Sequence, residues 1–201
     1  NAPENPRAFR LVGTRPVRPD GIDKVTGRAI YGPDFVAPGM LHGAILRSPH
    51  AHARFKIVDL TAARAAPGVV AVMTAADVGH LGDVPCQGQV GNADKSKTPY
   101  HGQPLLAQDT VRHVGDAVAM VVAETEAAAR AGAELIDIEW EPLDPAVDLI
   151  GAMAPGAPQV WDDVPGNLAY DAEIGDAAGA AAAFAKAAKV VKLRLVNNRL
   201  V

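Results

Sequence analysis

Residues 116–143, DAVAMVVAETEAAARAGAELIDIEWEPL, carry the clearest secondary-structure pattern in the chain. The segment opens on an apolar run, which is typical of a strand that is covered on both faces. Thr125 is placed to cap a helix, and Glu126 puts a carboxylate in its first turn, where it interacts favourably with the helix dipole. The IDIEW strand at 136–140 then alternates apolar and acidic residues. This order predicts a β-α-β crossover between parallel strands.

A second unit of the same kind lies upstream. The strand-like FKIVD at 55–59 is followed by a helix-like segment at 60–66 and by the apolar strand VVAVM at 69–73. Thr74 and Asp77 then form a weak capping box. Two such units on one sheet predict an α/β (α+β) fold: a two-layer domain with a mixed sheet and β-α-β units that ends near residue 148.

The segments outside these units are less regular. Residues 1–16 are Pro-rich and predict an extended N-terminal arm, and residues 79–102 are polar and Gly-rich and predict a long surface loop. Residues 149–171 read as a Pro/Gly/Asp-rich linker.

The last part of the chain returns to a regular pattern. Asp176 is expected to cap an Ala-rich helix at 177–188, and KVVKLRLV at 189–196 alternates like a strand. That strand lacks a partner among the remaining residues. Because the chain also starts at Asn1 rather than at Met, we expect it to be a piece of a longer protein whose missing sequence supplies the partner strand.

Composition argues against several classes of function. The net charge is −4 and no Lys/Arg cluster stands out, which argues against nucleic-acid binding. No apolar stretch approaches the roughly 20 residues that a membrane span needs. Cys86 is the single cysteine, so no internal disulfide is possible, and a reducing cytoplasm is the simplest compartment.

Nucleophiles and metal ligands are sparse. Ser48 and Ser96 lie outside any G-x-S-x-G elbow, and Ser48 reads as a turn residue beside a proline. Cys86 has no surrounding motif. The pair His50 and His52 would share a face of an extended segment, but no third ligand has a supporting spacing, so structural or surface histidines are the default interpretation.

Other chemistry-bearing patterns are equally weak. The carboxylate pairs Asp162/Asp163 and Glu139/Glu141 are expected to be solvated. No glycine-rich phosphate-binding motif is present. The residues alone predict an α/β domain without a defined activity.

Three long stretches of the sequence nevertheless resemble one protein family. They are VRPDGIDKVTGRAIYGPDF at 17–35, PGMLHGAILRSPHAHARFKIVDLTAARAAPGVVAVMTAADV at 38–78, and GQPLLAQDTVRHVGDAVAMVVAETEAAARAGAELIDIEWEPL at 102–143. In this order they resemble the start of the large, molybdenum-binding subunit of the xanthine dehydrogenase/aldehyde oxidase family. The final NNRLV resembles the lead-in to the first cofactor-binding lobe of that subunit.

The resemblance implies a domain layout and an activity. Residues 17–148 would form an α/β hammerhead domain, and residues 149–201 would be the linker and the start of the molybdopterin-binding domain. The parent enzyme would hydroxylate a heterocycle or an aldehyde with water. It would use molybdenum-molybdopterin, with [2Fe-2S] clusters and FAD elsewhere in the complex, and its partners would be the remainder of the molybdenum subunit and the iron-sulfur and FAD subunits or domains.

The family's catalytic and cofactor-binding residues would fall beyond Val201. No catalytic, cofactor-binding or metal-binding residue is therefore assigned to this chain, no cofactor is expected in it, and its role would be scaffold and subunit interface. The candidate contact residues are Arg47, His50, His52 and Arg54.

Two alternatives remain open. The chain would also fit a free-standing small-molecule-binding or interaction module built around the loop at 79–102. An enzyme complete within these residues would lack both a motif and room for a cofactor pocket.

Overall fold

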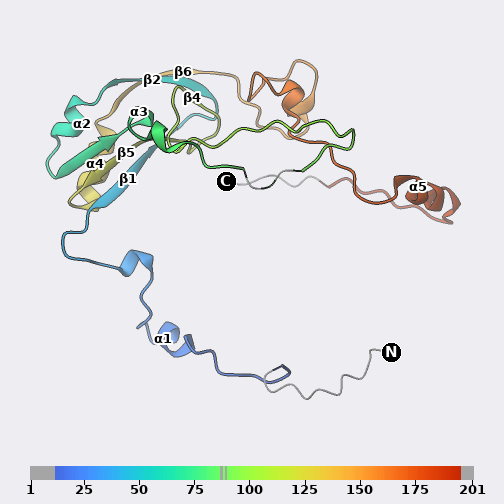
Figure 1. Ribbon diagram of the computed structural model, residues 1–201, viewed down its shortest axis with the longest axis horizontal. Helices are drawn as coiled ribbons and strands as arrows, with labels where there is room; N and C mark the ends of the chain where they lie inside the picture. Colours follow the sequence, from blue (N-terminus) through green and yellow to red (C-terminus); the bar gives the residue numbers. More distant parts are fainter. Residues whose placement is uncertain (1–11, 87, 89, 196–201) are drawn as a thin grey trace. The chain divides into compact units, whose positions relative to one another are not determined.

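The structure is a computed structural model that describes residues 12–86, 88 and 90–195 (Figure 1). The backbone divides into two compact units, Asn1–Met40 and Leu41–Val201. The first 11 residues of the expected arm at 1–16 lie outside the described residues, and residues 12–16 contain no helix or strand.

The first unit is held by local contacts. It contains the short helix α1 (Gly21–Val25) and the 3-10 turn η1 (Gly32–Asp34), neither of which has a buried residue. Arg18 and Lys24 both form ion pairs with Asp20 and hold the pKa of that carboxyl below its usual range. Because its apolar side chains are exposed, this unit has no hydrophobic core of its own among the described residues.

The second unit is built on two three-stranded sheets in which every pairing is antiparallel. The first sheet has the order β1-β5-β3 and the second sheet the order β4-β2-β6. The strands are β1 (His42–Arg47), β2 (Ala53–Asp59), β3 (Val69–Met73), β4 (Thr110–Val111), β5 (Ala117–Ala123) and β6 (Asp137–Pro142).

The α/β class is confirmed, but the expected mixed sheet with parallel β-α-β crossovers is wrong. Helix α2 (Thr61–Ala65) and helix α4 (Glu126–Glu134) each connect a strand of one sheet to a strand of the other. A parallel crossover needs a dozen or more residues, and only residues 60–68 separate β2 from β3. Strand β5 already has antiparallel neighbours on both edges, so β6 joins the second sheet.

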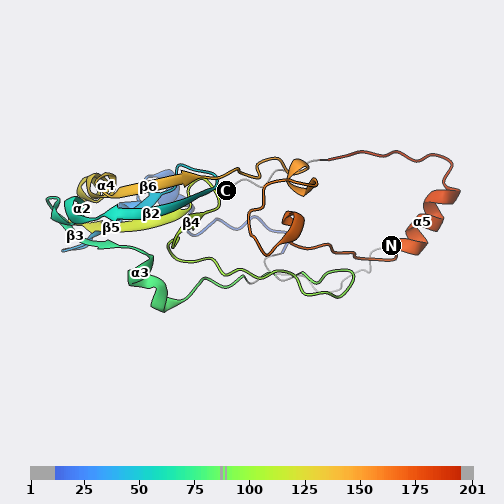
Figure 2. The same ribbon diagram turned by 90° about the horizontal axis from the view of Figure 1, so that it is seen from above.

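Two hydrophobic clusters fill the interior. In one, helices α2 and α4 pack on the inner face of the first sheet and bury Ala63, Val121 and Ala133 (Figure 2). In the other, Val118 of β5 packs with residues of β2 and β4. Val118 is fully buried and lies at an irregularity in the β1–β5 register. This irregularity lets β5 contribute side chains to both clusters.

The predicted helix caps are confirmed. The Thr125 hydroxyl accepts a hydrogen bond from the Ala128 amide at 3.1 Å. Thr74 begins α3 (Ala75–Val78) and forms a capping box with Asp77, and these hydrogen bonds hold the Asp77 pKa below its usual range. Asp176 caps α5 (Ala177–Lys186) by accepting from Gly179.

The expected strand at 189–196 does not form within the described residues. Residue 196 lies outside them, and residues 189–195 are not in a strand. Val191, Leu193 and Leu195 are each about 80% exposed. A lone segment cannot satisfy the hydrogen-bonding groups of a strand, so the alternating pattern produces no strand without a partner.

The remaining elements are the 3-10 turns η2 (Gly79–Leu81), η3 (Gly151–Met153) and η4 (Pro165–Asn167). The base of the loop at 79–102 is closed by a bridge between Val84 and Gln103. Among the described helices, none combines the length and apolar character that a bilayer crossing requires.

Candidate functional site

The connection between β1 and β2 is fastened to the turn before β5. Ser48 is buried, its amide donates to the Asp116 carbonyl at 2.8 Å, and its carbonyl accepts from the Gly115 amide at 2.9 Å. Arg47 Nη1 donates to the Gly115 carbonyl at 2.8 Å. The Ser48 hydroxyl donates to the His50 carbonyl and accepts from the His50 amide, which confirms that Ser48 is a turn residue.

The two histidines of this connection make structural contacts. The His50 ring lies 5.1 Å from the Trp140 ring, between their centroids, at an angle of 53°. His52 Nδ1 lies 3.1 Å from the Asp144 carbonyl oxygen, and the His52 carbonyl accepts from the Leu143 amide at 2.9 Å. Within the described part of the chain, no three His, Cys, Asp or Glu side chains are grouped so as to hold a metal.

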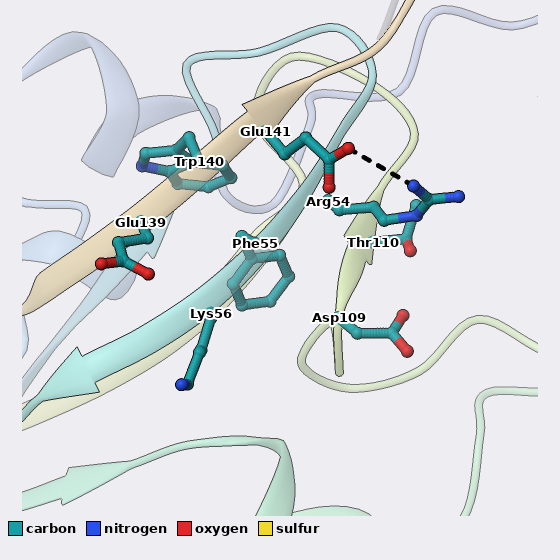
Figure 3. Close-up of a pocket in the computed structure, with 8 residues that line it drawn as sticks. All are labelled: Arg54, Phe55, Lys56, Asp109, Thr110, Glu139, Trp140 and Glu141. Carbon is teal, nitrogen blue, oxygen red and sulfur yellow. Dashed lines mark ion pairs between the residues drawn. The ribbon is translucent and has the colours of Figure 1, made fainter.

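Charged residues cover the outer face of the second sheet around an open hollow of about 560 Å³ (Figure 3). Arg54 Nη1 lies 3.5 Å from Glu141 Oε1, and Lys56 stands opposite Glu139 in the strand register. Arg54 and Glu141 are about two-thirds exposed, so their ion pair is worth only about 0–1 kcal/mol. Solvated charge explains this carboxylate pair, as expected from the sequence.

A stacked cluster that the sequence did not predict surrounds Trp161. The His101 ring stacks on the indole with centroids 3.8 Å apart and planes within 10°, and Arg112 Cζ lies 3.6 Å from the indole centroid. His101 and Arg112 both lie so close to the indole centroid that one face of the ring has no room for both. They therefore stack on opposite faces of the Trp161 ring. The Arg112 Nε also donates to the Val160 carbonyl at 3.1 Å.

Asp163 completes this cluster. Its Oδ1 lies 3.3 Å from His101 Nε2, within ion-pair distance, although that buried nitrogen has no partner in hydrogen-bond geometry among the described residues. Hollows of about 280 and 420 Å³ adjoin the stack, and His101 and Trp161 line both. The signal in the sequence was Trp161 itself, because a large aromatic residue in a Pro/Gly/Asp-rich segment is typical of an anchor.

The loop at 79–102 and the segment at 149–171 are also joined away from Trp161. The Ala93 amide donates to the Asp171 carbonyl at 2.8 Å, and the Asp171 amide donates to Asn92 Oδ1 at 2.9 Å. The expected linker is therefore packed along the expected loop, and the two segments support each other.

Asn167 organises the segment at 149–171 from within. Its φ is 55°, in the left-handed region that Asn tolerates. Its side-chain oxygen accepts from the Val160 amide, and its nitrogen donates to the carbonyls of Ala152 and Pro158, each at 2.8 Å.

Replacement of Asn167 by alanine is expected to destabilise this segment by about 1–2 kcal/mol, because three hydrogen bonds are lost. Amide hydrogen exchange of residues 150–167 measures the effect. Asn167→Gly tolerates the backbone conformation but lacks the side-chain amide. It should therefore lose most of the same protection from hydrogen exchange. Unchanged exchange in both variants would mean that the side chain does not organise the segment.

The chain matches one family model and several curated proteins. Residues 26–144 match the family described as aldehyde oxidase and xanthine dehydrogenase, a/b hammerhead domain. The carbon monoxide dehydrogenase large chain of Afipia carboxidovorans is 36% identical over 96% of this chain and 25% of its own length. The xanthine dehydrogenase molybdenum-binding subunit of Escherichia coli O157:H7 is 40% identical over 76% of this chain and 20% of its own.

Solved structures agree with these matches. Quinoline 2-oxidoreductase from Pseudomonas putida 86 superposes with a TM-score of 0.67 at 40% identity, over 76% of this chain and 19% of its own. Reconstituted CO dehydrogenase from Oligotropha carboxidovorans gives a TM-score of 0.69 at 35% identity, over 88% of this chain and 22% of its own. The chain spans a quarter or less of the length of these relatives. It belongs to the aldehyde oxidase and xanthine dehydrogenase family and contains the a/b hammerhead domain of that family.

Proposed function

We propose that this chain is the N-terminal portion of the molybdenum-binding subunit of an oxidoreductase that hydroxylates a heterocycle or an aldehyde. The oxygen atom comes from water, and two electrons and two protons leave for each substrate oxidised. The observation that carries the proposal is the match of residues 26–144 to the hammerhead domain, together with relatives that are molybdenum-binding subunits.

Within that subunit we assign this stretch to scaffold and subunit interface. Residues 1–16 would be an N-terminal arm, 17–148 the hammerhead domain, and 149–201 the linker and the start of the molybdopterin-binding domain. The interlocked connection between β1 and β2 supports a scaffold role, since its side chains are used to hold the turns together.

The interface proposal rests on the same connection. Arg47 and Arg54 are exposed, so each still presents a guanidinium group to a partner. His50 and His52 are half-buried and would act by fixing the shape of the surface between the two arginines.

The molybdenum-molybdopterin cofactor would be held by other parts of the subunit. We assign the described residues no cofactor contact and derive no reaction step from them. The [2Fe-2S] clusters and FAD would lie on partner subunits or domains, and the complex would work in the cytoplasm.

The activity is tested on the full-length subunit purified with its iron-sulfur and FAD partners. The enzyme is incubated with a panel of heterocycles and aldehydes in ¹⁸O-labelled water with an artificial electron acceptor. We expect a hydroxylated product that carries ¹⁸O. A product labelled from ¹⁸O₂ instead, or no oxidation of any panel member by a complex that contains all its cofactors, would contradict the proposal.

A small-molecule-binding module is the second candidate, favoured by the two hollows that His101 and Trp161 line. It predicts that the 201-residue chain binds heterocycles or aldehydes without molybdenum. Thermal-shift screening tests this, with Trp161→Ala as the variant that removes the shared lining side chain and Trp161→Phe as the matched control. A stabilising ligand whose effect is kept in Trp161→Phe and lost in Trp161→Ala supports a binding site, and no shift across the panel counts against one.

A further inference from the structure

The turn at 112–116, between β4 and β5, holds the connection that leads from β1 to β2. The Arg47 guanidinium bonds through Nη1 to the Gly115 carbonyl at 2.8 Å, and the buried Ser48 exchanges backbone hydrogen bonds with the same turn. Gly115 has a φ of 91°, in the left-handed region that favours glycine. The exposed Arg47 is therefore attached to a turn of defined shape.

Asp116 carries this attachment across the turn. Its backbone carbonyl accepts from the Ser48 amide at 2.8 Å, and its side-chain Oδ2 accepts from the Arg112 amide at 3.1 Å. His113 Nδ1 lies 3.7 Å from the same Oδ2, and the Asp116 side chain is only 19% exposed. One residue thus bonds both to the connection after β1 and to the first residue of the turn.

Arg112 links the turn to the segment at 149–171. It directly follows β4, its Nε donates to the Val160 carbonyl at 3.1 Å, and its guanidinium lies 3.6 Å from the centroid of Trp161. The direction of the Arg112 side chain depends on its backbone, which the Asp116 carboxylate holds. A change in the turn that moves Arg112 would therefore weaken its hold on the segment.

We propose that the turn at 112–116 couples Arg47 to the segment at 149–171, so that a partner carboxylate bound to Arg47 holds the segment more firmly. A guanidinium has five N–H donors, one of which bonds to Gly115, and a carboxylate can bind others in a bidentate pair. Such a pair would fix Arg47 on the turn. The inference rests on the proposed function, because that function places Arg47 at a subunit interface.

The coupling acts in both directions. If partner binding strengthens the docking of the segment, docking strengthens partner binding by the same factor. The segment leads into the part of the chain that we assign to the molybdopterin-binding domain. Assembly of the complex would thereby order the start of that domain.

Hydrogen exchange of the full-length molybdenum-binding subunit tests the coupling. Arg47→Ala removes the bond to Gly115, and we expect exchange at residues 158–169 to rise about fivefold, the size that corresponds to one hydrogen bond. Arg54→Ala is the matched control. Arg54 is also an exposed arginine near the start of β2, but it pairs with Glu141 on β6, so its loss should leave the segment unchanged.

Two further arms test the route and the partner. Asp116→Ala should raise exchange at residues 158–169 as Arg47→Ala does, whereas Asp116→Asn keeps an oxygen acceptor for the Arg112 amide and should retain most of the protection. Addition of the iron-sulfur and FAD partner subunits should lower exchange at the same residues in the unmodified subunit and have no such effect in Arg47→Ala.

The outcomes separate the coupling from the proposed function. No rise in Arg47→Ala, an equal rise in Arg54→Ala, or equal effects of the two Asp116 variants would overturn the coupling. An equal rise in the amides of β3 and β5 would also overturn it, because it would reflect a general loss of stability. A rise in Arg47→Ala with no effect of the partners would uphold the coupling and overturn the assignment of Arg47 to the interface.

Discussion

Replacement of Gly132 by valine is expected to lower the free energy of unfolding by about 2–3 kcal/mol. Gly132 is buried where α4 crosses the first sheet, and a Cβ there would lie 2.8 Å from Val69 Cγ2 and 3.1 Å from Val121 Cγ1. Both contacts come from short branched side chains of the core, so the helix must move away from the sheet. Overpacking of this kind costs about 1–3 kcal/mol, and three added carbons place the change at the upper end.

The neighbouring exposed position provides the control. Ala131→Val changes the same helix but faces solvent, so it should cost only its lower helix propensity, about 0.5 kcal/mol. Urea denaturation followed by circular dichroism measures both variants. Equal losses of unfolding free energy in Gly132→Val and Ala131→Val would show that α4 is not packed on the sheet through Gly132.

Replacement of Trp161 by alanine is expected to release the segment at 149–171 from the domain. The substitution removes the surface on which His101 and Arg112 stack and deletes a large side chain, which costs about 3 kcal/mol where the site is well packed. That free energy corresponds to a rise of roughly a hundredfold in hydrogen exchange for amides that open with this segment. The amides of the core strands should keep their protection, because neither His101 nor Trp161 lies in a strand.

Trp161→Phe is the matched control because it keeps an aromatic face for both neighbours. It should retain most of the protection at residues 158–169. Fluorescence offers a second readout, since Trp140 is the other tryptophan and remains in both variants. Unchanged exchange in Trp161→Ala would mean that the Asn92–Asp171 contacts hold the segment without the stack.

The sequence predicted the elements better than their pairing. Apolar runs and caps located β5, α4 and β6, because burial and capping are local properties. The same pattern assigned β6 to the wrong sheet, since periodicity states which residues are buried but not against which strand. The short span between β2 and β3 was the available clue that a parallel crossover does not fit.

The contacts around the candidate site could be predicted from the sequence only in part. Arg47, His50, His52 and Arg54 come from a stretch that resembles the family, and their role as contact residues stays a prediction. The structure shows that Arg47 bonds to the turn at Gly115 and that Arg54 pairs with Glu141 on the neighbouring strand. The Trp161 cluster brings together His101, Arg112 and Trp161 from separate irregular segments. Their meeting depends on tertiary packing, which no local period encodes.

The central claim is that this chain is scaffold and that the metal chemistry belongs to the rest of a molybdenum-binding subunit. The most direct test compares molybdenum content, by inductively coupled plasma mass spectrometry, of the full-length subunit and of residues 1–201 expressed in one host that makes the cofactor. We predict stoichiometric molybdenum in the full-length protein and only background in residues 1–201. Molybdenum retained by residues 1–201, or absent from the full-length protein while a known relative is loaded in the same host, would contradict the claim.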